Sequence, residues 1–132
     1  MKFVFAALVS LAIVGALDYV TGYQISFSVF YLLPVSLAAW YAGRLWGIAV
    51  SVAASITWYF VEGQVAPVYD HSLIPFWNAL VRFIFFLVNS LLLSALRERL
   101  VVESRMARTD GLTGLFNLRA FEEQLAHDLA LN

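Results

Sequence analysis

The chain of 132 residues contains no cysteine, which excludes a disulfide framework and any metal site built from thiolates. Charged residues are also scarce, at 13% of the chain, where an average soluble domain has about 25%. Hydrophobic residues make up 62%, and the mean hydropathy is +0.81. These values are typical of a protein whose solvent is the lipid bilayer. The net charge of −1 gives no indication of a nucleic-acid partner, and none is predicted.

Four long apolar runs account for this composition. They cover about residues 2–19, 25–42, 45–61 and 72–96. Each run suits a membrane span, which needs about 20 apolar residues. Pro34 lies in the middle of the second run, where it removes a backbone hydrogen bond and should kink the helix. We therefore predict an all-α membrane protein built as a bundle of four transmembrane helices.

The first run has a second interpretation, as a cleaved signal peptide. Lys2 would be its charged start, residues 3–16 its apolar core and Gly15-Ala16 its small-residue cleavage site. A single lysine is a weak start, and Asp18 follows almost at once, so a retained helix is favoured. Cleavage would leave three spans and the same location for the C-terminus.

The cations flank the spans on one side only. The connections on the other side contain Asp18, Glu62, Asp70 and His71, and no lysine or arginine. Under the positive-inside rule, the cationic side is the cytoplasm. We predict a multi-pass protein of the bacterial cytoplasmic (inner) membrane with both termini in the cytoplasm, because that side holds Lys2, Arg44, Arg97, Arg99, Arg105, Arg108 and Arg119.

Aromatic residues gather near the ends of the runs. Trp and Tyr side chains at such positions are typical of belts at the two membrane surfaces. On the side away from the termini, the predicted belt consists of Tyr19, Tyr23, Trp58, Tyr59, Tyr69 and Trp77.

Arg82 lies inside the fourth run, and an ionisable residue at that depth needs a partner or a cavity. Steps of three and four residues place a stripe on the same helix face as Arg82, namely His71, Pro75, Asn78, Phe85 and Asn89. We predict that this face looks into the bundle or across a dimer. Asp18 is the expected partner of Arg82, Glu62 is the second choice, and Tyr31 could add a hydroxyl.

Three roles remain open for these polar residues. One is a buried ion pair that fixes helix packing, and another is a site where Arg82 holds an anionic group of an unknown small molecule. The third is a pH- or voltage-sensitive role, for which His71 is the only candidate that titrates near neutrality. We predict no metal and no cofactor in this chain. The alternative is a haem, which would need His71 from two subunits or a different second ligand.

The third run carries small residues at every fourth position, at Gly47, Ser51 and Ser55. Small side chains at this spacing let helix backbones approach closely in a membrane. The stripe predicts close packing, either within the bundle or between the subunits of a homodimer.

The fourth run is followed by a stretch without helix breakers, which extends from Pro75 to Asp110. We predict that the helix leaves the bilayer and continues to about Ala107, forming a linker at residues 97–109 that pairs as a cytoplasmic coiled coil. Glu103 interrupts the seam, so a solvated, unpaired helix is the alternative. The apolar set at a and d spacing is Leu93, Leu96, Leu100 and Ala107.

The next stretch reads Asp110-Gly111-Leu112-Thr113-Gly114-Leu115-Phe116-Asn117-Leu118-Arg119-Ala120-Phe121. It resembles the opening of GGDEF domains, D-x-L-T-G-L-x-N-R-R-x-F. The GGDEF domain is the diguanylate cyclase module, which condenses two GTP into cyclic di-GMP. Leu118 replaces the first arginine of that pattern, and the resemblance covers only about residues 107–125.

The residues of this motif suit a structural role. Thr109 and Asp110 supply capping side chains, Gly114 is competent for a turn, and Asn117 is a suitable N-cap for a helix over residues 118–131. We expect Asp110, Thr113, Gly114 and Asn117 to form a hinge to the output domain. They are not the family's catalytic residues, because its acidic metal-binding positions and signature loop lie further along.

The resemblance implies that the parent protein is a diguanylate cyclase, which uses GTP and Mg and joins one GTP from each subunit across a homodimer. We then expect residues 1–96 to be a membrane sensory or regulatory domain that dimerises. Residues 110–132 would be the truncated start of the GGDEF domain, without enzyme activity of its own. The alternatives are a bundle that binds or transports a small molecule, quinone or haem, and a passive membrane anchor.

Overall fold

The structure, a computed structural model, describes residues 1–22, 25–65 and 70–131, together with their side chains except at 65 and 108–117. The chain divides into two compact units, Met1–Leu96 and Arg97–Asn132, and each is described by itself. Within the described residues all regular structure is helical and there is no strand. The predicted all-α class is confirmed.

The first unit begins with helix α1, which ends where Gly22 adopts a positive φ of 69°. The second apolar run forms three short pieces of different helix type. A second glycine with positive φ, Gly43 at 102°, makes the tight turn into α3. The elements are α1 (Lys2–Thr21), the 3₁₀ helix η1 (Ser28–Tyr31), α2 (Leu32–Leu37), the π-helix η2 (Ala38–Ala42), α3 (Arg44–Val65) and α4 (Leu73–Ala130).

Three of the four expected spans are long and apolar enough to cross a membrane: Lys2–Thr21, Arg44–Gln64 and Leu73–Ala107. The second run differs, because its helical part is limited to Ser28–Ala42. At 1.5 Å per residue that stretch reaches about 22 Å, short of a hydrocarbon core of about 30 Å. The predicted segment of about residues 25–42 is thus helical only from Ser28 onward, and a count of four membrane spans stays a prediction. Buried Pro34, which lacks an N–H, lies within the broken stretch.

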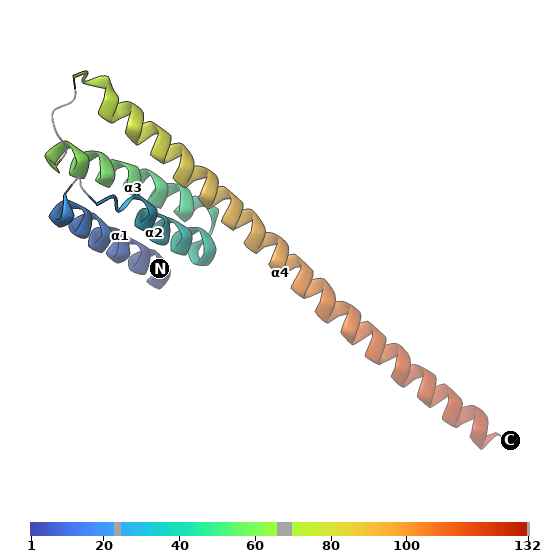
Figure 1. The fold of residues 1–132 in the computed structure, drawn as a ribbon. Helices are drawn as coiled ribbons and strands as arrows, with labels where there is room; N and C mark the ends of the chain where they lie inside the picture. Colours follow the sequence, from blue (N-terminus) through green and yellow to red (C-terminus); the bar gives the residue numbers. More distant parts are fainter. Residues whose placement is uncertain (23–24, 66–69, 132) are drawn as a thin grey trace. The chain divides into compact units, whose positions relative to one another are not determined.

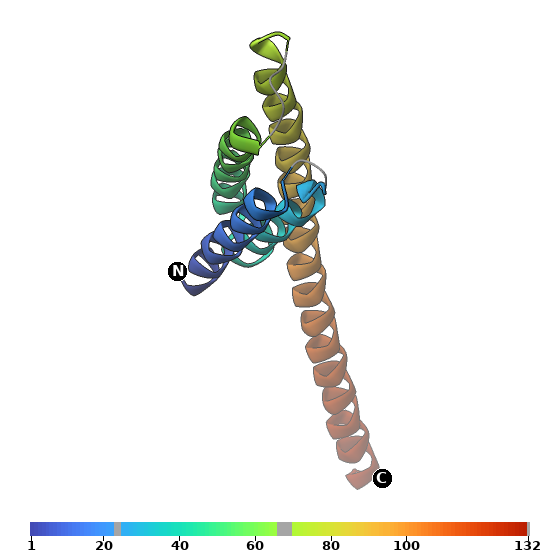
Figure 2. The ribbon, with the colours of Figure 1, turned by 60° about the vertical axis from the view of Figure 1, so that its left-hand side comes forward.

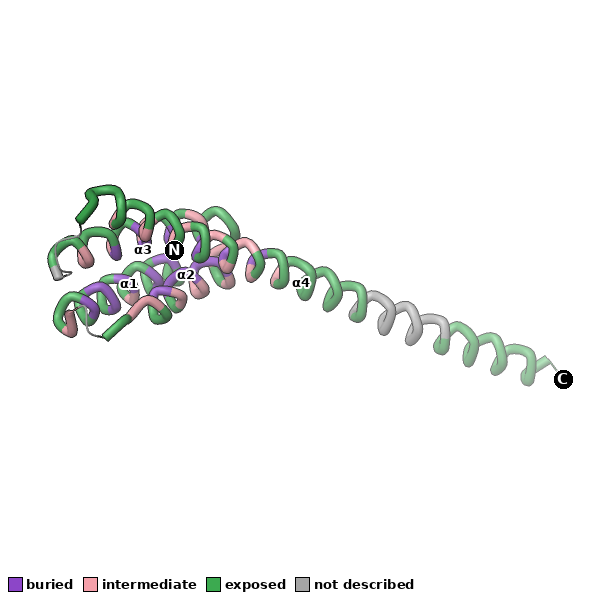
Figure 3. Tube along the Cα trace, turned by 45° about the horizontal axis from the view of Figure 1, so that its top comes forward, coloured by how far each residue is buried: buried purple, intermediate pink, exposed green. Residues whose placement is uncertain are grey.

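Helices α1, α2 and α3 pack against one another, and Figures 1 and 2 show them side by side. Their shared core is apolar, and it includes Phe86 from α4. Figure 3 shows the buried positions along the inner sides of these helices. The core residues are Ala7, Leu11, Val14, Tyr31, Val35, Ala38, Val50, Ala54, Trp58 and Phe86.

The outward faces of the helices are as apolar as the core. Only 33% of the α1 span, 33% of the α3 span and 17% of the α4 span are buried inside the protein. Exposed positions include Phe5, Ile13, Phe60 and Leu92. A helix that is hydrophobic all round is a membrane span or lies in the core of a large protein. The exposed apolar surface therefore supports a membrane protein.

The second unit consists of the later part of α4, which runs to Ala130. The sequence predicted that the helix would end near Ala107 and form a hinge at Asp110, Thr113, Gly114 and Asn117. The backbone is instead helical through these positions, so the expected break is absent. Glycine and asparagine each cost a helix only about 1 kcal/mol or less, whereas proline, which the stretch lacks, costs about 3 kcal/mol. The hinge side chains lie outside the described residues.

The described side chains of this unit are exposed from Glu98 onward (Figure 3). Arg119 and Glu123 form a surface ion pair one turn apart, with Nε and Oε1 separated by 3.9 Å. Such exposed pairs contribute little stability. Pairing of this helix as a coiled coil stays a prediction.

Candidate functional site

Two buried polar groups meet between α1 and η1. The Tyr31 hydroxyl donates a hydrogen bond to Asp18 Oδ2 at 3.0 Å. Asp18 is only 8% exposed and Tyr31 is fully buried. A hydrogen bond to a carboxylate is stronger than one between neutral groups, and burial removes the competition from water. Tyr31 therefore fixes the Asp18 side chain within the bundle.

Arg82 of α4 lies against Trp58 of α3. Its Cζ atom is 3.7 Å from the centroid of the Trp58 ring, which is the geometry of a cation–π contact. Trp58 is 6% exposed. The predicted place of Trp58 in an interfacial aromatic belt is therefore wrong, because its ring belongs to the core and supports the Arg82 guanidinium.

These two contacts belong to one neighbourhood, which we call the polar cluster: Asp18, Tyr31, Trp58 and Arg82. Tyr31 and Trp58 both belong to the core of the first unit. Tyr31 also stacks with Phe86, with ring centroids 6.3 Å apart. Tyr31 thus lies beside Asp18, and a direct bond from Asp18 to Arg82 stays a prediction.

Close helix packing surrounds the Tyr31 hydroxyl. A Cβ atom at Gly15 would lie 2.9 Å from Thr57 Cγ2 and 3.8 Å from the Tyr31 hydroxyl. Only glycine lets α1 approach α3 to this distance without a shift of one helix. Gly15, which sequence reasoning considered only as part of a cleavage site, thus helps to shape the polar cluster.

The other predicted polar residues are less concentrated. Glu62 and Asn78 are partly buried, and His71 is exposed at the start of α4. Asn89 is partly buried, and its Nδ2 atom donates to Ser36 Oγ at 3.2 Å. The exposure of His71 agrees with a place at the rim of the membrane, and its part in ligand or haem binding stays a prediction.

The face of α4 that points into the bundle is rotated by about one residue from the predicted face. Phe85, which the stripe placed inside, is 57% exposed, whereas Phe86 is 1% exposed. Beyond Phe86 the inward positions are Ser90 and Ser94, both buried. The inward face runs through Arg82, Phe86, Ser90 and Ser94 at a spacing of four residues. This pattern is hard to recognise in the sequence, because the neighbouring positions of α4 are equally apolar.

Small residues line a second contact region of α4, which we call the serine seam: Ser36, Ala39, Gly47, Asn89, Ser90 and Ser94. Ser94 Oγ donates to the Ala39 carbonyl at 3.3 Å. A Cβ atom added at Gly47 would overlap Ser90 Oγ and lie 2.9 Å from Ala39 Cβ. The seam therefore joins α4, α3 and η2 at close range.

The stripe at Gly47, Ser51 and Ser55 faces the interior of the bundle. Ser51 is fully buried, and Ser55 is buried as well. Their hydroxyls donate to Gly47 O and Ser51 O, each at 2.8 Å, so α3 satisfies them itself. The interpretation as packing within the bundle is confirmed.

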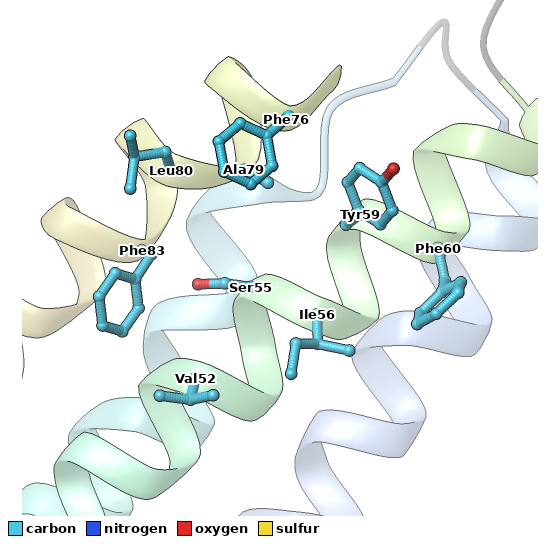
Figure 4. Close-up of a pocket in the computed structure, with 9 residues that line it drawn as sticks. All are labelled: Val52, Ser55, Ile56, Tyr59, Phe60, Phe76, Ala79, Leu80 and Phe83. Carbon is cyan, nitrogen blue, oxygen red and sulfur yellow. The ribbon is translucent and has the colours of Figure 1, made fainter. Parts of the chain in front are cut away.

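An apolar groove lies between α3 and the first turns of α4 (Figure 4). Its volume is about 530 Å³, and Ser55 and Tyr59 supply the hydroxyls among its lining residues. Since Ser55 donates to its own helix, the groove suits an apolar group better than a polar one. The lining residues are Val52, Ser55, Ile56, Tyr59, Phe60, Phe76, Ala79, Leu80 and Phe83.

Comparison with known families places the chain. Residues 2–110 match the family described as Domain of unknown function (DUF4118). The chain belongs to this family. No curated protein and no solved structure matches it. The match covers the whole first unit and ends at Asp110, the first residue of the GGDEF-like motif.

Proposed function

We propose that this DUF4118 domain is a membrane sensory or regulatory domain that controls a C-terminal diguanylate cyclase making cyclic di-GMP. The observation that carries the proposal is the motif at residues 110–121, which resembles the opening of a GGDEF domain. The family match ends where this motif begins. A membrane domain followed directly by an enzyme is the arrangement expected of a receptor.

The continuous helix α4 supports direct transmission. Its backbone is helical from Leu73 to Ala130. In this proposal a rotation or displacement at the span is passed to the motif along this helix. In this proposal the protein is a homodimer, paired through membrane helices and the linker at residues 97–109, because the cyclase joins two GTP molecules held by two subunits.

The proposed topology has four membrane segments in the bacterial inner membrane and both termini in the cytoplasm. The one-sided distribution of cations supports this orientation. In this proposal the second segment crosses as the shorter apolar helical stretch Ser28–Ala42. Asp18, Glu62 and Asp70 then lie toward the outer surface, and the polar cluster forms the sensing site in the outer half.

The deciding experiment measures cyclic di-GMP synthesis from GTP and Mg²⁺ by membrane vesicles that contain the full-length protein. We expect synthesis, together with a changed rate when Asp18→Asn or Arg82→Gln alters the polar cluster. Lack of synthesis by the folded, membrane-inserted protein would refute the cyclase assignment. Synthesis that ignores both variants would leave a cyclase whose membrane domain is a passive anchor.

The apolar groove favours a second candidate function, the binding of a hydrophobic small molecule such as a quinone. A volume of about 530 Å³ lies within the range of about 300–1,000 Å³ typical of small-molecule sites. Native mass spectrometry of the purified domain tests this function, because it reports retained ligand and subunit number together. A dimer without added mass would count against the second candidate and support the first.

A further inference from the structure

The end of the second apolar run has a hydrogen-bond pattern that differs from an α-helix. The Gly43 N–H donates to the Ala38 carbonyl at 3.1 Å, five residues back. In an α-helix the same N–H would bond the Ala39 carbonyl, four residues back. The π-helix η2 therefore leaves the Ala39 carbonyl without its α-helical donor.

Ser94 of α4 donates a hydrogen bond to this Ala39 carbonyl. Its hydroxyl donates to Ala39 O at 3.3 Å, and both residues are buried. Buried serines of α3 behave differently, because Ser51 and Ser55 donate to carbonyls of their own helix. Ser94 thus donates its hydrogen bond to η2 and not to a carbonyl of its own helix.

We propose that η2 is a two-state latch that Ser94 holds in its π form. In the other state the hydrogen bonds of the turn move by one residue, and Gly43 N–H bonds Ala39 O. Ser94 is then released and donates to the Ser90 carbonyl in its own helix, as Ser51 does to Gly47. Both states satisfy the Ala39 carbonyl, so neither leaves this buried acceptor without a donor. Gly43, with φ of 102°, accommodates the altered turn because it lacks a side chain.

The latch makes the geometry of η2 depend on the position of α4. A displacement of α4 that withdraws Ser94 favours the α form, and a ligand or signal acting on α4 shifts the two populations. A π-helix has more residues per turn than an α-helix, so conversion rotates Tyr41 relative to α1. In the π form Tyr41 stacks on Phe3, with ring centroids 4.8 Å apart. This inference concerns the membrane domain alone and does not depend on a cyclase.

Disulfide trapping in the complete chain tests the latch, since the sequence has no cysteine of its own. The pair Phe3→Cys and Tyr41→Cys reports the π form. The pair Ser36→Cys and Asn89→Cys reports the contact of α4 before the π turn, where the native side chains approach to 3.2 Å. Each pair is oxidised in a redox buffer in vesicles, and free thiols are counted with a maleimide polymer.

We expect Ser94→Ala to lower the disulfide-to-thiol ratio of the first pair by up to about threefold, the equilibrium factor of an average hydrogen bond between membrane helices. The second pair should keep its ratio. Ser90→Ala is the matched control, because Ser90 is equally buried one turn earlier and its hydroxyl makes no hydrogen bond within the described residues. It should leave both ratios unchanged.

Three results would overturn the latch. A loss in both pairs with Ser94→Ala would mean that the hydroxyl holds α4 in general. An unchanged first pair would mean that η2 keeps its π form without Ser94. An equal effect of Ser90→Ala would assign the change to packing in the seam.

Discussion

Helix α4 contacts the rest of its unit through two regions of opposite chemistry. In the polar cluster it contributes a guanidinium, which lies on Trp58 near the Asp18–Tyr31 hydrogen bond. In the serine seam, further along α4, it contributes neutral groups that meet Ala39 and Gly47 at close range. The same helix therefore carries a charged contact and a contact made by small side chains.

The difference separates two physical tasks. Charges in a medium of low dielectric constant interact over several ångströms, so the polar cluster can respond to a charge or dipole that arrives nearby. Hydroxyl groups and glycine act only at contact distance, so the serine seam fixes the separation of the helices. In our proposal the polar cluster serves detection and the serine seam serves transmission, and the predictions below test this division.

The largest expected effect concerns transmission beyond both regions. Adding one residue at a time between Arg97 and Arg108 leaves both contacts intact but rotates the downstream residues by about 100° per added residue. In our proposal, cyclic di-GMP synthesis by the full-length protein should vary with the number of added residues and return after seven. Activity that ignores insertion length would make the linker a loose tether and the domain an anchor.

The serine seam should tolerate added volume poorly. Gly47→Ala places a Cβ atom onto Ser90 Oγ and close to Ala39, and overpacking of this kind costs up to about 3 kcal/mol. Denaturation of the detergent-solubilised protein measures the loss. Gly63→Ala is the control in the same helix, because nothing lies within 4 Å of its added Cβ atom. Equal effects of the two variants would contradict the close approach.

The polar cluster should show coupling between its charges. Asp18→Asn weakens the hydrogen bond from Tyr31, and a bond to a charged acceptor contributes about 2 kcal/mol. Arg82→Gln should also destabilise the bundle, and the double variant should lose less than the sum of the two. Strictly additive losses in denaturation would show that Asp18 and Arg82 do not interact.

Alanine substitutions at two serines of the seam, one helical turn apart, should change the free energy of unfolding in opposite directions. Ser94→Ala should cost about 0.6 kcal/mol, because it removes a hydrogen bond between membrane helices. Ser90→Ala should instead stabilise the protein by about 1 kcal/mol, since a buried hydroxyl without a partner carries a desolvation cost. Unfolding midpoints of the two variants that move in the same direction would argue against this assignment.

Single-cysteine substitutions, which should perturb the protein least, test on which side of the membrane each region lies. Single cysteines at exposed positions should leave stability unchanged, and an impermeant thiol reagent reports their side. In our proposal, outside labelling modifies Gln64→Cys and spares Arg44→Cys, because the cations mark the cytoplasm. The reverse pattern would invert the topology and place the polar cluster near the cytoplasm.

Sequence reasoning located the residues of the polar cluster better than their contacts. The contact of Arg82 was predictable because a cation inside an apolar run requires an interaction partner. Asp18 and Tyr31 were the nearest candidates at the matching depth. Trp58 was missed, since a tryptophan near the end of a span is more often interfacial. The inward face of α4 was placed at Phe85 instead of Phe86, because both neighbours are equally apolar.

The helix ends show a related limit. Gly22 and Gly43 interrupt the helices close to where the apolar runs end. The break-up of the second run into 3₁₀, α and π pieces had only Pro34 as a signal. The expected hinge at residues 110–117 lies within helical backbone, since weak turn residues do not outweigh the helix-forming residues on either side.

The amino-acid sequence alone was enough to establish the all-α class, the apolar lengths of the spans, the one-sided cations and the need for a partner at Arg82. These properties are local matches between a segment and its solvent, so they can be read residue by residue. Three contacts became visible only in the folded chain. The Arg82 guanidinium lies on the Trp58 ring, Ser90 packs against Gly47, which has no side chain, and Ser94 donates a hydrogen bond to Ala39 in the π-helix η2. The reason is that lipid-facing and bundle-facing side chains are equally apolar, so the rotation of each helix is set by shape and by a few hydrogen bonds between distant residues.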